Sequence, residues 1–372
     1  MRNSLFRFLV AALVGCGMIT LTIARADEPK DEKARKPVGL AKTTGTPRYQ
    51  ILNINNISTW HTSDGEANFP PSRVGDGLVY PRGTGSLIYR DGLVWGGKVF
   101  QDAAKTIPGG QNQPIRAGGN EYVQGNQPGR IVGTGASAVS ADQNLPEVRI
   151  YRIRRDWNTM TEDELKRDAG ETNEITPAQA TADQVAAIKG QYQKDWDEWP
   201  ASLGAPYIER NGIPGYQKPP RFNYDPNAGA LLTHDDLVAG KYDEPGVAGA
   251  DPNVPADEVL WTVYNDLNRS LTTSTFGSEP MGIEGQTTYW GYKRTDALGN
   301  CVFRRVRIIN KGGVLIDGVN KGSFFIDSMY VGMFSDPDLG NAGDDLIGCA
   351  PLLGLSFVYN GNPIDGAFAG YS

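Results

Sequence analysis

The residues best suited to chemistry form an acidic stretch near the end of the chain. Asp336, Asp338, Asn341, Asp344 and Asp345 place five oxygen-bearing side chains within ten residues of a glycine-containing loop. Calcium takes about six to eight hard oxygen ligands, and backbone carbonyls and water can complete such a set. The spacing is not that of an EF-hand, because neither the glycine nor the closing glutamate falls where it is required. The stretch predicts a calcium site, with a solvated acidic turn as the alternative.

A second polar group, Asn265, Asp266 and Asn268, follows a run of strand-forming residues. These side chains could add metal ligands, or they could make Asx-type hydrogen bonds to their own turn. We favour the turn.

Two cysteines, Cys301 and Cys349, are candidates for a disulfide. In an oxidising compartment they pair if the fold brings their Cα atoms within about 7 Å, and otherwise both stay free. No Cys-x-x-Cys or Cys/His spacing indicates zinc or iron, and the chain has only His61 and His234 as further nitrogen ligands.

Catalytic patterns are weak, and we assign no catalytic or cofactor-binding residue. With 43 acidic residues, a pair of carboxylates suited to glycoside hydrolysis arises by chance, and no pair stands out. The chain has no Gly-x-Ser-x-Gly elbow for serine chemistry. Gly133, Gly135 and Ala138 match a dinucleotide fingerprint only superficially, because no helical pattern follows them.

The N-terminus has the three parts of a secretory signal. Arg2 and Arg7 precede or flank an apolar run over residues 8–23, which ends in the small-x-small exit Ala24-Arg25-Ala26. The run is shorter than the roughly 20 residues needed to span a membrane, so we expect residues 1–26 to be cleaved. Leu13-Val14-Gly15-Cys16 resembles a lipobox, which keeps lipidation on Cys16 as an alternative. Either route predicts an extracellular or cell-surface protein.

The net charge argues against nucleic-acid binding. Removal of residues 1–26 takes three Arg and no acid, which changes the formal charge from −7 to −10. Such an acidic chain is a poor partner for nucleic acid or an anionic membrane. Arg152, Arg154 and Arg155, like Arg304, Arg305 and Arg307, lie inside apolar runs, so we interpret them as the solvated faces of strands.

The composition, with 46 Gly and 24 Pro, favours a mainly β fold. We expect a large β-sandwich with strands at 51–57, 86–89, 93–100, 121–124, 148–153, 259–264, 285–293, 301–310, 323–334 and 352–359. Trp60, Trp95, Trp261 and Trp290 lie in or beside these runs, where core packing is the usual role and a sugar-stacking platform is the alternative.

The remaining segments differ in character. Residues 27–48 lack large apolar side chains and predict a disordered spacer before the β-rich module 49–372. A helical insertion is expected at 161–199, where Thr176 and Pro177 start a helix over 178–196 whose apolar stripe packs on the sheet. Residues 200–256 are dense in Pro, Gly, Asn and Asp and predict an irregular insertion. Nothing after residue 26 is apolar and long enough to cross a membrane.

Several motifs together carry a resemblance to a known family. They are Asn56-Ile57-Ser58-Thr59-Trp60, the run 86–98, the run 151–156, Trp199-Pro200 to Pro206-Tyr207, Asn265 to Asn268 and Ser335 to Gly340. In that order they resemble the N-terminal module of large, mostly uncharacterised secreted or surface proteins of Bacteroidota-like bacteria. The resemblance covers most of residues 50–361 and implies location more than activity.

Two departures from this family are visible. Its members carry alternating carboxylates after the Gly-Ala-Pro-Tyr motif, whereas residues 209–215 here lack them. Its members also continue beyond the point where this chain stops, often to a type IX secretion sorting domain, so we expect this chain to be C-terminally truncated.

These observations predict a secreted or cell-surface module with a structural, adhesive or ligand-binding role, stabilised by calcium if the acidic stretch binds it. Its partner would be an extracellular ligand such as a polysaccharide or a surface protein. The alternative is a carbohydrate-active hydrolase that acts outside the cytoplasm.

Overall fold

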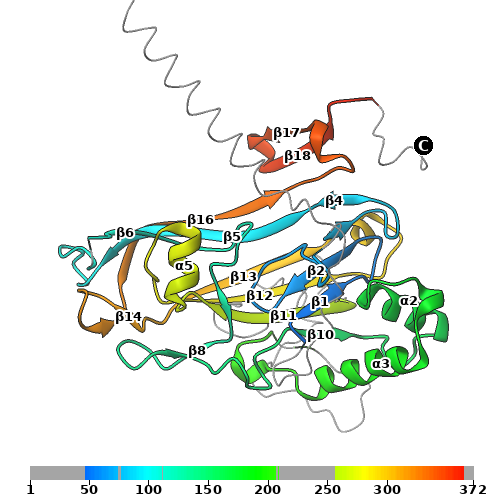
Figure 1. The fold of residues 1–372 in the computed structure, drawn as a ribbon, viewed down its shortest axis with the longest axis horizontal. Coiled ribbons are helices and arrows are strands. Elements are labelled where there is room, and N and C mark those ends of the chain that lie inside the picture. The colour runs from blue at the N-terminus through cyan, green and yellow to red at the C-terminus, as the bar shows by residue number, and fades with distance from the viewer. Residues whose placement is uncertain (1–46, 74–76, 111, 207, 209–255, 364–372) are drawn as a thin grey trace, which may run out of the picture. The chain divides into compact units, whose positions relative to one another are not determined.

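The computed structural model describes residues 47–73, 77–110, 112–206, 208 and 256–363. The chain divides into two units, residues 1–39 and 40–372, and every described residue lies in the second. Most of its elements are antiparallel strands, which confirms the prediction of a mainly β fold (Figure 1). None of the helices in these ranges is long and apolar enough to cross a lipid bilayer.

The centre of this unit is an antiparallel sheet whose strands follow the order β10, β11, β12 and β13. Their bounds are Tyr151–Arg154, Glu258–Asn265, Ile283–Gly291 and Phe303–Asn310, and the short β7 (Gln127–Pro128) pairs with β11. Every residue of β11 and β12 is buried. Because successive side chains of a strand point to opposite faces, both faces of this sheet must be covered.

One face of the central sheet packs against strands from both ends of the described chain. Leu93 and Trp95 of β5 meet Tyr264 of β11 in one hydrophobic cluster. Ala67 pairs with both His61 and Asp91 and so connects two runs of strands. The first run is β1 (Tyr49–Leu52), β2 (Ser58–Thr62), β3 (Leu78–Val79) and β4 (Ser86–Ile88); the second is β16 (Phe325–Asp336), β5 (Arg90–Phe100) and β6 (Ile115–Gly119).

The opposite face of the central sheet is covered by helices. Trp196 of α3 packs with Ile153 and Val259, which lie on β10 and β11. A threonine cap box starts the helices at 162–172 and 182–197, where the threonine and the residue three positions later satisfy each other's backbone N–H. The helical elements of this region are α2 (Glu162–Thr172), the 3₁₀ turn η1 (Pro177–Gln179) and α3 (Ala182–Asp197), followed by η2 (Ala201–Leu203).

Shorter elements complete the unit. Two small hairpins are formed by β8 (Ile131–Val132) with β9 (Val139–Ser140) and by β14 (Val314–Leu315) with β15 (Lys321–Gly322). Helix α5 (Arg269–Phe276) follows β11, and η4 (Ala297–Asn300) precedes β13. After β16 come η5 (Ala342–Asp344) and the hairpin of β17 (Asp345–Ala350) and β18 (Leu355–Asn360), joined by η6 (Pro351–Leu353).

Several predicted boundaries change in the structure. The helix expected from Pro177 is interrupted at Ala180, because Thr181 supplies a second cap and restarts the chain as α3. Residues 121–124 form a turn closed by the Asn120–Gln124 bridge instead of a strand. The acidic stretch runs directly into β17, which the sequence analysis did not predict.

The interpretation of Arg152 and Arg154 as solvated residues is wrong. Arg152 is 2% exposed and Arg154 is 5% exposed, since α2 and β11 bring acidic partners to them. Arg152 Nη2 lies 2.8 Å from Asp168 Oδ1, and its Nε lies 2.5 Å from Glu258 Oε1. The arginines of β10 therefore join the helices to the sheet.

Some expectations concern residues outside the described ranges. These are the signal segment 1–26 with Cys16, nearly all of the spacer 27–48, and residues 209–255 of the expected irregular insertion.

Candidate ligand-binding pocket

The acidic stretch forms a turn whose side chains bond to the backbone. Asp345 Oδ2 accepts a hydrogen bond from Leu339 N at 2.9 Å, and Asp344 Oδ2 accepts one from Asn362 N at 3.1 Å. Asn341 Oδ1 caps η5 through Gly343 N. Asp338 continues the same turn, where its backbone N–H donates to Leu87 O.

Asp336 ends β16, and burial raises its pKa. Within the described chain, no group of three or more His, Cys, Asp or Glu side chains is placed to hold a metal ion. The calcium site stays a prediction.

The two cysteines are not paired. Cys301 and Cys349 are both free thiols. Cys301 Sγ donates to Ala297 O at 3.3 Å, within its own 3₁₀ turn, whereas Cys349 lies opposite Ser356 in the β17–β18 hairpin. Of the two alternatives for these cysteines, the structure therefore has both thiols free.

Asn265 and Asn268 bond within their own turn, as we favoured, whereas the Asp266 carboxylate bonds to a distant segment. Asn265 Oδ1 accepts from Leu267 N at 3.0 Å, and Asn268 caps α5. The Asp266 carboxylate accepts three backbone N–H groups from the start of β12. Burial raises the pKa of Asp266 to about 6, although those N–H groups act to lower it.

The four tryptophans singled out by the sequence are core residues. Trp60, Trp95, Trp261 and Trp290 are all between 1% and 7% exposed. None of the four therefore presents an open ring on which a sugar could stack.

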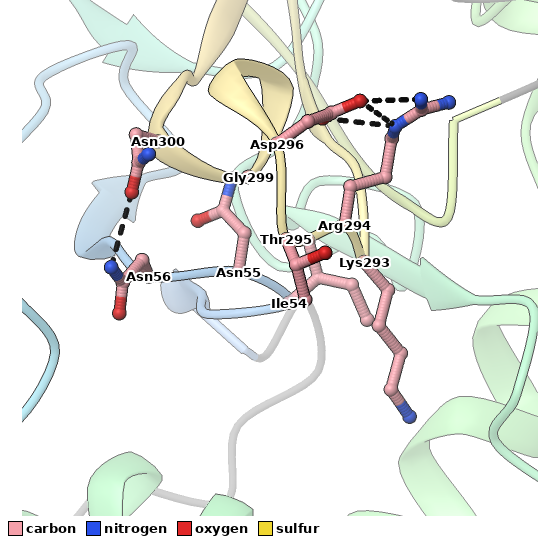
Figure 2. A pocket seen from close by; sticks show the side chains of 9 residues that line it. All are labelled: Ile54, Asn55, Asn56, Lys293, Arg294, Thr295, Asp296, Gly299 and Asn300. Carbon is pink, nitrogen blue, oxygen red and sulfur yellow. Dashed lines mark hydrogen bonds and ion pairs between the residues drawn. The ribbon is translucent and has the colours of Figure 1, made fainter.

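An open pocket of about 450 Å³ lies between two loops that the sequence separates by more than 200 residues (Figure 2). One loop follows β1 and contributes Ile54, Asn55 and Asn56; the other runs from the end of β12 to β13. The residues of this second loop that line the pocket are Lys293, Arg294, Thr295, Asp296, Gly299 and Asn300.

Hydrogen bonds hold the two loops of the pocket together. Asn56 N donates to Gly299 O at 3.0 Å, and Asn56 Nδ2 donates to Asn300 Oδ1 at 3.1 Å. Asn55 Nδ2 donates to Cys301 O at 2.8 Å, while its Oδ1 accepts from Ile57 N at 2.9 Å. The first loop is thereby fixed against the second, and the carboxamides of Asn56 and Asn300 stand exposed at the rim.

The charged residues of the pocket have partners of opposite charge. Arg294 and Asp296 form a bidentate ion pair, with Nε on Oδ1 and Nη2 on Oδ2, which lowers the pKa of Asp296. Lys293 Nζ lies 2.9 Å from Asp156 Oδ2 and 3.0 Å from Glu164 Oε1. The hydrogen bond with Asp156 is the largest cause of the raised pKa of Lys293. Net charge in the pocket is thus largely compensated, and the uncharged amides dominate its hydrogen-bonding capacity.

The sequence analysis did not identify this site. Its signal was the run Asn53-Ile54-Asn55-Asn56, which we placed inside a strand predicted at 51–57, whereas β1 ends at Leu52 and this run forms a loop. Nothing local connects that run to Asn300, because the contact depends on how β1 docks beside the β12–β13 turn.

A second open pocket, of about 390 Å³, lies between the start of β6 and the end of α5. Arg116 lines it but is 2% exposed, and its guanidinium donates to Pro280 O and Gly110 O. The charge in this pocket is therefore committed to backbone carbonyls, which indicates a structural role for Arg116.

The interior also holds ionisable groups that line neither pocket. Burial, and then the charge of Arg304, holds the pKa of His61 well below its usual value. His61 is 2% exposed, its ring lies 3.7 Å from that of Tyr289, and neither imidazole nitrogen has a hydrogen-bond partner. Burial, and then Asp64, raises the pKa of Glu66 to about 8.

Comparison with protein-family models, with curated proteins and with solved structures finds no match. The chemistry of the described residues is therefore the basis for a functional assignment.

Proposed function

We propose that this chain is an exported, non-catalytic β module that binds a neutral, polyhydroxylated ligand of the saccharide class at the cell surface or outside the cell. The observation that carries this proposal is the lining of the pocket between the β1 and β12 loops. Asn56 and Asn300 supply exposed carboxamides there, held in place by the buried Asn55. A carboxamide both donates and accepts hydrogen bonds, as a sugar hydroxyl does.

The ion pairs of the pocket support a neutral ligand over a charged one. An anionic ligand would have to displace Asp296 from Arg294, or two carboxylates from Lys293. Displacing a bidentate partner from arginine costs the charge-assisted hydrogen bonds that the pair already makes. A neutral ligand leaves these pairs intact and uses the amides.

Export and architecture belong to the same proposal. The basic start, short apolar run and small-x-small exit of residues 1–26 support secretion. We take the central sheet and the strands of the β5 and β1 runs as a β-sandwich, because one hydrophobic cluster joins β5, β11 and β12. Calcium bound at the Asp336–Asp345 stretch would brace the connection from β16 to β17.

A carbohydrate-active hydrolase is the second candidate, and Glu66 is the observation in its favour. A carboxyl group with a pKa of about 8 stays protonated at neutral pH, as a general acid must. However, Glu66 is 1% exposed and lies against Gln124 and Arg90. Substrate could reach it only if the surrounding strands opened, so we favour the binding role.

The test is binding of neutral oligosaccharides to the purified protein, first on an array and then by titration with the strongest binder. We expect the N56A/N300A double variant to bind roughly tenfold more weakly, because it removes about two hydrogen bonds of about 0.5–1.5 kcal/mol each. Both side chains are exposed and bond to each other, so the variant should fold normally.

Asn158→Ala is the matched control, because Asn158 is an exposed asparagine outside the pocket lining. Unchanged binding by N56A/N300A would contradict the pocket assignment. Release of new reducing ends from the bound oligosaccharide, abolished in Glu66→Gln, would favour the hydrolase.

A further inference from the structure

The hairpin of β17 and β18 exposes an apolar face. Leu346, Leu355, Phe357 and Tyr359 point to the same side, because the register pairs Leu346 with Tyr359 and Gly348 with Phe357. Each of these four side chains is between 47% and 52% exposed. Gly348 leaves room for the Phe357 ring, since a Cβ at that position would come within 2.3 Å of Phe357 Cζ.

The hairpin is also unsupported by other strands. In the part of the chain that the structure describes, β17 and β18 pair only with each other. A two-stranded hairpin is at best marginally stable in water without a third strand or a packed face. An exposed apolar face on an unpaired strand edge is therefore expected to have an occupant.

The charge of this region identifies a suitable occupant. Residues 325–363, which contain β16 and the hairpin, include five Asp and no Lys or Arg. Strand β13 has the opposite character, with Arg305 and Arg307 on one face and no acid, while Arg304 on the other face lies over the ring of Tyr289. β13 is also the last strand of the central sheet, so one of its edges has no strand partner among the described residues.

The order of residues along the two strands is complementary as well. β13 begins with its arginines and ends with Ile308 and Ile309. β18 begins with Leu355 and Phe357, and its end at Asn360 lies opposite Asp345. Antiparallel pairing of β18 with β13 would place the acidic end of the hairpin beside the arginines and the apolar end beside the isoleucines.

We infer that this chain associates with copies of itself, head to tail, through antiparallel addition of β18 of one copy to the free edge of β13 in the next. The contact joins two different surfaces, so each copy keeps one unused hairpin and one unused edge. Such heterologous contacts produce rings or open chains instead of a closed two-fold dimer. The same addition would extend the central sheet from one copy into the next.

Sedimentation velocity of the purified full chain over a range of concentrations tests this inference. We expect the average mass to rise with protein concentration and to fall as salt is raised, because salt screens the Asp–Arg attraction. The R305E/R307E variant removes the basic edge, and F357K/Y359K gives the hairpin face positive charge. Each variant alone should be monomeric.

Mixing the two variants separates head-to-tail pairing from every symmetric alternative. R305E/R307E keeps its hairpin and F357K/Y359K keeps its β13 edge, so a 1:1 mixture should associate although neither variant does so alone. Lys189→Glu on α3 and Ile115→Lys on β6 are controls that make the same kinds of charge change at exposed positions outside both surfaces, and both should associate like the natural chain.

If R305E/R307E does not fold, R307E alone serves, since Arg307 is exposed and donates to Gly204 O. A natural chain that stays monomeric at all concentrations overturns the inference. A mixture of folded variants that stays monomeric also overturns it.

Discussion

Single residues in the interior of this protein carry unusual proton affinities. Glu66 and His61 both lie close to strand β2 or on it, and both are buried. Burial disfavours the charged form of each, so it raises the pKa of the carboxyl and lowers that of the imidazole. Such groups make stability depend on pH even when they take no part in binding.

Glu66→Gln should remove one of these pH dependences. The folded protein holds Glu66 neutral up to a pH of about 8, whereas the unfolded chain ionises it near a pH of about 4.5. Unfolding therefore releases a proton between these values, and stability from this group is present below pH 4.5 and lost as pH rises towards 8. The natural protein should lose roughly 5 kcal/mol more than Glu66→Gln over this window, because the pKa of Glu66 rises from 4.5 to about 8 and each pKa unit corresponds to about 1.36 kcal/mol.

Urea unfolding of both proteins at several pH values measures this difference. Glu121→Gln is the control, because it makes the same substitution at a partly exposed glutamate in a turn. If the free energies of unfolding of the natural protein and Glu66→Gln changed in parallel with pH, the raised pKa of Glu66 would be contradicted.

At the scale of elements, a buried ionic network joins helix α2 to strands β10 and β11. Asp168 accepts hydrogen bonds from Arg152 Nη2 at 2.8 Å, from Asn53 Nδ2 at 2.9 Å and from Tyr192 Oη at 2.8 Å. Burial acts to raise the pKa of Asp168, but Arg152 and Arg154 outweigh it and lower that pKa to about 2. This network connects β1, β10, α2 and α3 through one carboxylate.

Asp168→Ala should destabilise the protein by about 3–5 kcal/mol, because it leaves the buried Arg152 with one acidic partner fewer and strips Asn53 and Tyr192 of an acceptor. Urea unfolding gives the free energy, and hydrogen exchange should show the loss concentrated in α2 and α3. Asp163→Ala, on the exposed first turn of the same helix, should cost below about 1 kcal/mol. A loss below about 1 kcal/mol in Asp168→Ala would mean that packing alone holds the helices.

At the scale of the whole molecule, one prediction concerns calcium bound at the Asp336–Asp345 stretch. A ligand bound only by the native state raises stability by mass action, in proportion to the logarithm of its concentration above the Kd. Asp344 Oδ2 and Asp345 Oδ2 would have to share or exchange their backbone N–H partners to bind the ion, whereas Asp344 Oδ1 makes no hydrogen bond. Calcium binding would therefore change the connection from β16 to the hairpin.

Thermal melts with calcium, and then with a chelator, test the predicted site. We expect the midpoint to fall by several degrees on chelation and to become insensitive in a D344N/D345N variant. Magnesium at the same concentration is the control, because it prefers a smaller octahedral site. A cooperative melt whose midpoint does not change with calcium would contradict the calcium site and favour the alternative of a solvated acidic turn.

Local chemistry in the sequence determined the class of fold and many element boundaries. Strand-forming runs predicted strands at 259–264 and 285–293, where β11 and β12 lie. The Thr-x-x-Glu and Thr-x-x-Gln boxes start α2 and α3, because caps depend only on residues three positions apart. The core role of Trp60, Trp95, Trp261 and Trp290 followed from their place in apolar runs.

Tertiary structure alone decided the features on which function depends. From the sequence, Arg152 was interpreted as a surface residue. The fold buries it against Asp168 and Glu258, and Glu258 lies 106 positions away along the chain. The pocket requires Asn56 and Asn300 to meet across 244 positions. The physical reason is that strand docking and register set these contacts, and the free energy that selects them comes from the burial of whole sheet faces, which no local pattern records.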